Sequence, residues 1–152
     1  EGGFVMANYY TQASFLVSFE TKEKENEAST ILSALENHED EPCQGELKDL
    51  AKAMELEDYC YVGFSCQDED SLTWWIYADE TIDVNRTVQF FEYLVRKDLC
   101  KPFGFQWADT CSKARLDAFG GGAVFISKEG TEWMSTDAWL LEQSQKANGE
   151  DV

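Results

Sequence analysis

The sequence has a single histidine, and it contains no C-x-x-C pair. A zinc site is built from clustered cysteine and histidine, whereas the five cysteines are scattered and His38 stands alone. No apolar run reaches the roughly 18 residues of a membrane-spanning helix. No basic stretch followed by an apolar segment opens the chain, so no signal peptide is visible. These absences predict a cytoplasmic protein with reduced thiols and without a metal, a cofactor or a membrane partner.

Basic residues are also scarce. Thirty acidic residues stand against twelve basic ones, which gives a net charge of −18 and a pI near 4.2. Residues 20–83 hold 19 acids and 4 bases, a net of −15, whereas residues 86–115 hold 3 acids and 6 bases, a net of +3. Such a field repels nucleic-acid backbones and attracts basic protein surfaces. The charge therefore indicates a basic protein as partner and argues against direct binding of nucleic acid.

The rest of the composition is that of a folded protein. A chain of 152 residues fits one domain, and 43% hydrophobic with 14% aromatic residues can form a real core. We assign residues 6–147 to a single domain. Residues 1–5 precede Met6 and are interpreted as a remnant of processing or cloning, and residues 148–152 as a frayed tail.

Alternating apolar and polar residues predict the strands. One strand is expected over Tyr9–Phe19. Two more alternating runs, Tyr59–Cys66 and Leu72–Ala78, flank the polar segment QDEDS and predict a hairpin with that segment as its turn. Further strands are expected over 103–109, 122–127 and 131–135.

Apolar residues at helical spacing predict the helices. They are expected over about 24–37, 46–58, 84–99 and 136–147, with Asp83 as the N-cap of the third. The predicted core consists of Phe15, Val17, Ile31, Leu35, Val62, Phe64, Val88, Phe91 and Val95.

This order of elements predicts an α+β fold. Its first part is the βαββαβ pattern of ferredoxin-like domains, followed by an extra C-terminal hairpin and helix. We expect a mainly antiparallel sheet of five or six strands with the helices packed on one face. Adjacent Trp74 and Trp75 are expected on opposite faces of a strand. The oligomeric state stays open, and a pair of exposed aromatics on one strand face would be compatible with a homodimer.

The segment DAFGGGAV, residues 117–124, has two interpretations. A phosphate-binding loop places glycines after a strand and directly before a helix. Here the glycines precede an apolar strand pattern, which favours a bend, a bulge or a close backbone approach. An alternative function nevertheless uses this segment: a small enzyme or a nucleotide- or anion-binding protein built around Cys111, Lys113 and Gly120–Gly122, with Lys113 lowering the thiol pKa. A Cys–His pair would require His38, and nothing in the sequence brings the two together.

The carboxylates lack the alternating spacing and turn glycine of a calcium loop. They are either a solvated surface that keeps the protein soluble or an array that imitates a nucleic-acid backbone toward a basic groove of another protein. The second interpretation is our first choice, and it makes the protein a non-enzymatic interaction protein without catalytic residues. Its expected contact set is Glu36, Glu39, Asp40, Glu41, Asp68, Glu69, Asp70, Asp79 and Glu80.

The last third of the chain, around residues 107–133, carries the pattern FGFQWADTCSKARLDAFGGGAVFIS followed by a tryptophan. This pattern resembles short, mostly uncharacterised proteins of phages and mobile elements, including plasmid-borne neighbours of antirestriction genes that have a ferredoxin-like module. The resemblance implies a mobile-element origin, a bacterial cytoplasm and a counter-defence role. It supplies no catalytic residues.

Overall fold

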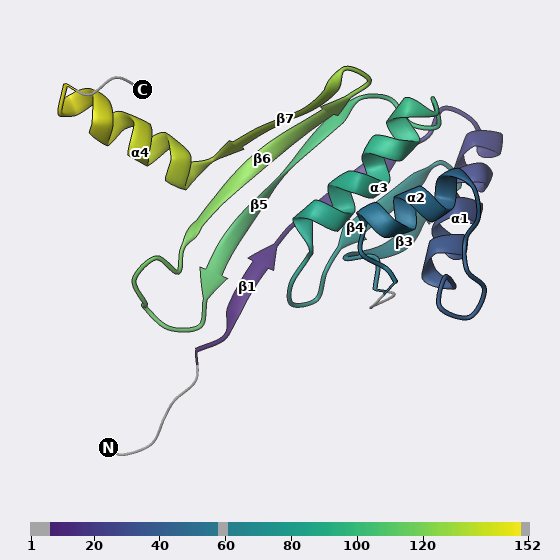
Figure 1. Ribbon diagram of the computed structural model, residues 1–152, viewed down its shortest axis with the longest axis horizontal. Helices are drawn as coiled ribbons and strands as arrows, with labels where there is room; N and C mark the ends of the chain where they lie inside the picture. The colour runs from purple at the N-terminus through teal and green to yellow at the C-terminus, as the bar shows by residue number, and fades with distance from the viewer. Residues whose placement is uncertain (1–6, 58–60, 150–152) are drawn as a thin grey trace, which may run out of the picture.

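A computed structural model describes residues 7–57 and 61–149 (Figure 1). The described chain forms two antiparallel sheets and four helices, which confirms the α+β class. The elements in chain order are β1 (Tyr9–Gln12), β2 (Ser14–Ser18), α1 (Lys22–Glu36), α2 (Glu46–Ala53), β3 (Ser65–Asp70), β4 (Thr73–Tyr77), α3 (Val84–Arg96), β5 (Phe103–Cys111), β6 (Gly120–Ser127), β7 (Gly130–Ser135) and α4 (Thr136–Ala147).

The predicted first strand is split at Ala13, and its two parts belong to different sheets. β1 pairs with β5 in a four-stranded sheet of order β1-β5-β6-β7, and β2 pairs with β4 in a three-stranded sheet of order β2-β4-β3. The expected single sheet of five or six strands is therefore wrong. Because of this split the strand order is not that of a simple ferredoxin fold.

The predicted hairpin is shifted along the chain. β3 begins at Ser65, so the carboxylates of the QDEDS segment lie within a strand instead of forming the turn. The turn falls at Ser71 and Leu72, where Asp70 Oδ1 accepts a hydrogen bond from Leu72 N (2.9 Å). β3 is the outer strand of its sheet, and an edge strand tolerates charge because one of its sides faces water. Residues 59 and 60 of the predicted hairpin, and residue 58 of the predicted helix before it, lie outside the described residues.

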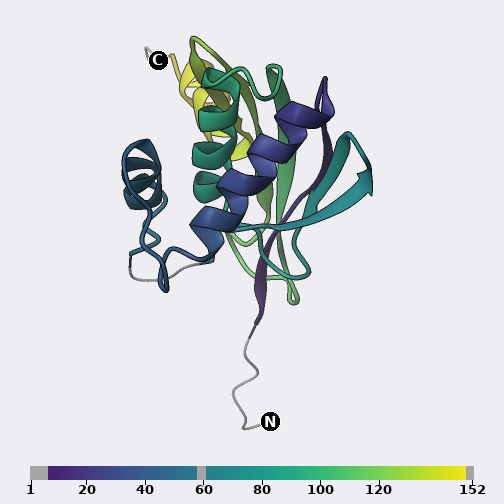
Figure 2. The same cartoon turned by 90° about the vertical axis from the view of Figure 1, so that its right-hand side faces the viewer.

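The helices follow the predictions more closely. α1 and α3 begin at side-chain caps, with Thr21 Oγ1 accepting from Lys24 N and Asp83 Oδ1 accepting from Arg86 N. α1 and α3 lie on one side of the sheets, and α2 packs against both of them (Figure 2). α4 differs, because it extends beyond the end of β7 and has no buried residue (Figure 1). The expectation that all helices pack on the sheet is therefore wrong for α4.

The core lies between the sheets and the helices. Eight of the nine predicted core residues are buried, and Phe91 is fully buried among aromatic rings. The exception, Phe15, is half-buried because it sits next to the split of the first strand. Its ring still stacks on Phe105, with centroids 4.3 Å apart.

The three consecutive glycines lie inside strand β6, so no helix follows them directly. A Cβ atom at Gly121 would come within 2.5 Å of the Trp107 carbonyl oxygen, and one at Gly122 within 2.4 Å of the Met134 carbonyl oxygen. Contacts of this length require glycine, which confirms the predicted close backbone approach. The segment is not a bend, since the strand pairs regularly with β5 throughout.

Candidate protein-interaction surface

The structure places all nine predicted contact carboxylates on the surface. Glu36 ends α1, and Glu39, Asp40 and Glu41 follow it in the connection to α2. The other five lie on β3 and in the connection from β4 to α3: Asp68, Glu69, Asp70, Asp79 and Glu80. We call these nine residues the acidic surface.

The acidic surface is not neutralised by the chain itself. Among residues 7–57 and 61–149, eight ion pairs form, and none includes a residue of the acidic surface. Eight of the twelve lysines and arginines form these ion pairs, all with other acids. Lys24 and Lys101, for example, both bind Glu20 and lower the pKa of its carboxyl. The nine carboxylates of the acidic surface thus keep their negative charge without a cationic partner among the described residues.

Two parts of the acidic surface act on Cys66 in β3. Burial, together with the smaller effects of the negative charges of Asp68, Glu36 and Glu25, raises the pKa of the Cys66 thiol to about 12. Desolvation by the surrounding protein also raises the pKa of the Glu36 carboxyl, although the residue as a whole stays exposed.

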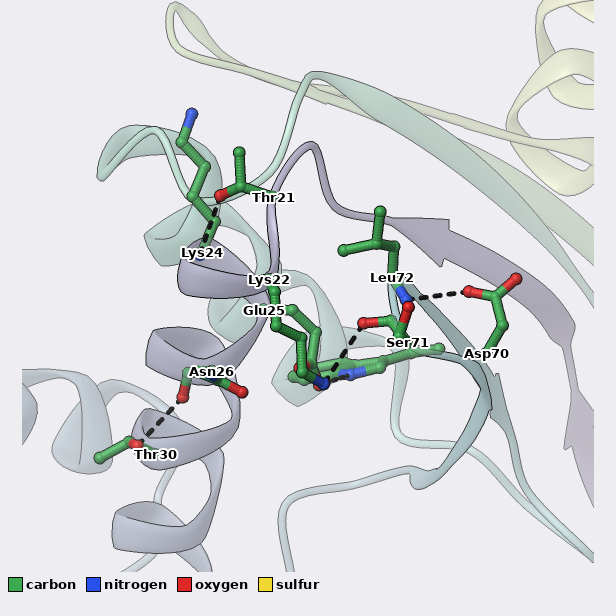
Figure 3. A network of polar contacts seen from close by, with 10 residues as sticks. Thr21, Lys22, Lys24, Glu25, Asn26, Thr30, Asp70, Ser71 and Leu72 are labelled. Carbon is green, nitrogen blue, oxygen red and sulfur yellow. Dashed lines mark hydrogen bonds and ion pairs between the residues drawn. The ribbon is translucent and has the colours of Figure 1, made fainter.

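A buried carboxylate holds the β3–β4 hairpin against α1 (Figure 3). Glu25 is only 5% exposed, and it accepts hydrogen bonds from Trp74 Nε1 (2.8 Å) and from Lys22 Nζ (2.8 Å). Lys22 Nζ also donates to the carbonyl oxygen of Ser71 in the hairpin turn (3.4 Å). Although burial opposes its ionisation, these two donors keep the pKa of Glu25 below its ordinary value. The hairpin that carries three residues of the acidic surface is therefore fixed in position.

An open cleft of about 690 Å³ adjoins the acidic surface. Asp79 and Glu80 line it together with Tyr9, Tyr10 and Tyr61. Carboxylates beside aromatic rings are the chemistry that receives a guanidinium or ammonium group. The sequence analysis missed the three tyrosines because Tyr61 and the adjacent pair Tyr9 and Tyr10 are far from each other and from Asp79 and Glu80 in the chain.

The residues of the alternative enzyme site do not form a phosphate cradle. Cys111 ends β5 and pairs with Tyr9, and Lys113 lies in the following turn. Around Gly120, a Cβ atom would find Thr136 Oγ1, Asp137 Oδ1 and Asp109 Oδ2 within 3.8 Å. Two carboxylates beside the glycines disfavour a bound anion. His38 is held elsewhere, because its Nδ1 accepts a hydrogen bond from Cys43 N (2.9 Å).

Within the part of the chain that the structure describes, no group of three or more His, Cys, Asp or Glu side chains is arranged to hold a metal ion. No helix of that part has the length and apolar character needed to cross a bilayer. Comparisons of the chain with protein-family models, curated proteins and solved structures found no match. Because no comparison indicates a function, the function is proposed from the geometry of the acidic surface.

Proposed function

We propose that this chain is a non-enzymatic interaction protein that presents its acidic surface to a basic groove of another protein, in imitation of a nucleic acid. The observation that carries the proposal is the net charge of −15 in residues 20–83, where none of the nine carboxylates joins an ion pair of the described residues. A protein that only has to stay soluble does not need this concentration of charge, because scattered charges keep it soluble equally well. Unpaired carboxylates on a fixed support are available to a partner.

The spacing of the charges supports this proposal. Asp68, Glu69 and Asp70 are consecutive on β3, so at roughly 3.3 Å per residue they are spread over about 7 Å, and two other segments add the remaining six carboxylates. An array of several charges matters because single exposed ion pairs contribute only about 0–1 kcal/mol each. Several charges held together steer a basic surface into place and compete with the phosphates of a nucleic acid.

The biological setting remains part of the proposal. The pattern over residues 107–133 resembles proteins of phages and mobile elements, and an acidic mimic fits a counter-defence inhibitor in the bacterial cytoplasm. The ferredoxin-like module is also proposed on a topological argument. If β1 and β2 are counted as one bent strand, the strands follow one another as β3-β4-β2/β1-β5, the order in which a βαββαβ module arranges its four strands.

The decisive experiment is a pull-down from bacterial lysate with the wild-type protein and three variants of matched charge. Two variants reverse parts of the acidic surface, Asp68, Glu69 and Asp70 to Lys in one and Glu39, Asp40 and Glu41 to Lys in the other. The control reverses three exposed acids outside it, Asp117, Glu129 and Glu132. Each variant moves the net charge by six units, from −18 to −12.

A specific basic partner is expected to bind the wild type and the control at about 50 mM salt and to be lost by about 500 mM, because screening shortens from above 10 Å to a few ångströms. The two surface variants should release it at low salt, mainly through slower association. Duplex DNA added to the purified pair should displace this protein. If all four proteins retain the partner equally, or if DNA does not displace this protein, the acidic surface only keeps the protein soluble.

A further inference from the structure

The second unusual surface of the molecule is apolar and lies at its other end. α4 begins at the cap Ser135, whose Oγ accepts from Ala138 N (3.2 Å), and Thr136 Oγ1 donates to the Gly121 carbonyl oxygen. Beyond this anchor the helix exposes Trp139, Leu140 and Leu141 at 55%, 57% and 60%. Three consecutive residues at 100° intervals occupy more than half of the helix circumference. The described chain covers none of the three.

A helix of twelve residues is marginally stable by itself in water, and most helices depend on packing of an apolar face. α4 has no such packing within the chain. Trp139, Leu140 and Leu141 are therefore apolar residues typical of a buried helix, but they are exposed to solvent. Exposed apolar residues that lie together are typical of an interaction surface.

A complementary groove lies on the four-stranded sheet. The register places Gly104 opposite Phe125 and Ala123 opposite Met134, on the face away from buried Phe105 and Val124. These four residues line an open, mainly apolar groove of about 500 Å³. Gly104 and Ala123 keep its floor low, while Phe125 and Met134 are 52% and 54% exposed. α1, α2 and α3 lie on the other side of the sheets (Figure 2).

The charge distribution indicates what occupies this surface. Residues 84–152 hold ten acids and eight bases, a net charge of −2, whereas residues 20–83 carry −15. Two copies of a chain with a net charge of −18 repel each other in most orientations. They can approach closely through the nearly neutral C-terminal half, here called the neutral half, which is where both the apolar helix and the groove lie.

We propose that α4 of one copy packs into the sheet groove of a second copy, and the reverse, in a two-fold symmetric dimer. Helix and groove on the same chain give the self-complementary surface that such symmetry requires. The exposed residues involved are Phe125 and Met134 of the groove and Trp139, Leu140 and Leu141 of α4. Half-exposed large side chains offer roughly 100 Å² each, so two copies bury about 1,000 Å², near the minimum for a specific interface.

The first test measures mass in solution by light scattering and sedimentation over roughly 1–100 μM protein. The wild type should reach twice the monomer mass of 17.3 kDa. Leu140→Glu with Leu141→Glu should weaken the dimer about 100-fold or more, because it places two charges in the centre of the interface. The matched control Leu116→Glu changes a leucine that is 94% exposed in the β5–β6 connection, and it should leave the dimer unchanged.

The folding of each variant is checked by circular dichroism, and the α4 variant should keep its fold because none of its helix residues is buried. Higher salt should strengthen the dimer by screening the repulsion between copies, the opposite of its effect on a basic partner. A wild type that stays monomeric at 100 μM would overturn the proposal and leave the surface to a different protein, without affecting the proposed function of the acidic surface.

The pairing of α4 with the groove has its own test by mixing. A groove variant, Phe125→Lys with Met134→Lys, should also be monomeric. Mixed with the α4 variant, it should form a heterodimer, because one contact joins an intact helix to an intact groove and the other pairs the introduced glutamates with the introduced lysines. A mixture that contains only monomers would contradict this arrangement even if the wild type dimerises.

Discussion

The β3–β4 hairpin and the C-terminal arm, which consists of β7 and α4, are both peripheral, but they are supported in different ways. The hairpin places Trp74 and Ile76 in the core and is bonded to α1 through Glu25. The arm buries no residue of its helix. The hairpin thus holds charged side chains on a strand that is fixed to the core. The arm exposes apolar side chains on a helix that buries no residue. The difference indicates that the hairpin is ready for a partner as it stands, whereas the arm is completed by another chain.

The largest expected loss of unfolding free energy comes from the core, and it is compared with the loss from the exposed helix α4. Phe91→Ala should lower the free energy of unfolding by about 3–5 kcal/mol, because the ring is fully buried and its removal leaves a cavity. Leu141→Ala in α4 should change it by less than about 0.5 kcal/mol in dilute solution, since the side chain is already exposed. Urea titrations followed by fluorescence measure both. Equal losses would show that the arm is packed as well as the core.

A smaller loss of unfolding free energy is expected from a substitution where β5, β6 and β7 approach one another. Gly122→Ala should cost about 3 kcal/mol, because the new methyl group meets the Met134 carbonyl oxygen, which cannot rotate away. Gly120→Ala is the matched control on the same strand, since its nearest contact is 3.3 Å to the hydroxyl of Thr136. Thermal unfolding should separate the two variants, and similar melting temperatures would contradict the close approach.

Glu25→Ala should cost about 2 kcal/mol by leaving Trp74 Nε1 buried without its acceptor. The pH dependence gives a second readout. Because the folded pKa of Glu25 lies below its ordinary value, its contribution is fully present above about pH 4.3 and is lost as the pH falls through the folded pKa. The variant should therefore lose less stability than the wild type between about pH 5 and pH 3 in urea titrations. Parallel curves would mean that folding does not shift the pKa of Glu25.

The smallest effect concerns the acidic surface. Reversing Glu39, Asp40 and Glu41 to Lys should raise the unfolding free energy by a few tenths of a kcal/mol at low salt, because it relieves repulsion among unpaired carboxylates. The gain should vanish at about 500 mM salt. The same reversal at Asp117, Glu129 and Glu132 in the neutral half should bring less. A larger gain there would show that repulsion is not concentrated in residues 20–83.

The prediction of the fold succeeded where one local pattern decides the outcome. The stripe of Val88, Phe91 and Val95 behind the cap Asp83 predicted α3, and the alternation around Trp74 predicted β4. β3 was misplaced because its own residues are nearly all polar. Its strand conformation comes from pairing with β4, and pairing is a long-range property that composition does not show.

The candidate site was predictable to a similar degree. The carboxylates were identified because charge is visible in any sequence, and the structure leaves them exposed. Their lack of internal ion pairs was not visible, since it depends on where each lysine and arginine ends up. The tyrosines beside Asp79 and Glu80 escaped prediction for the same reason, because three separate segments bring them to one cleft.

The sequence by itself determined the α+β class, the helices, most of the core and the concentration of negative charge in residues 20–83. These follow from periodicity and composition, which act between neighbours in the chain. Only the tertiary structure decided the division into two sheets at Ala13, the edge position of β3 and the exposure of α4. Each of these depends on which distant segment takes the free hydrogen bonds or covers the apolar side chains of another.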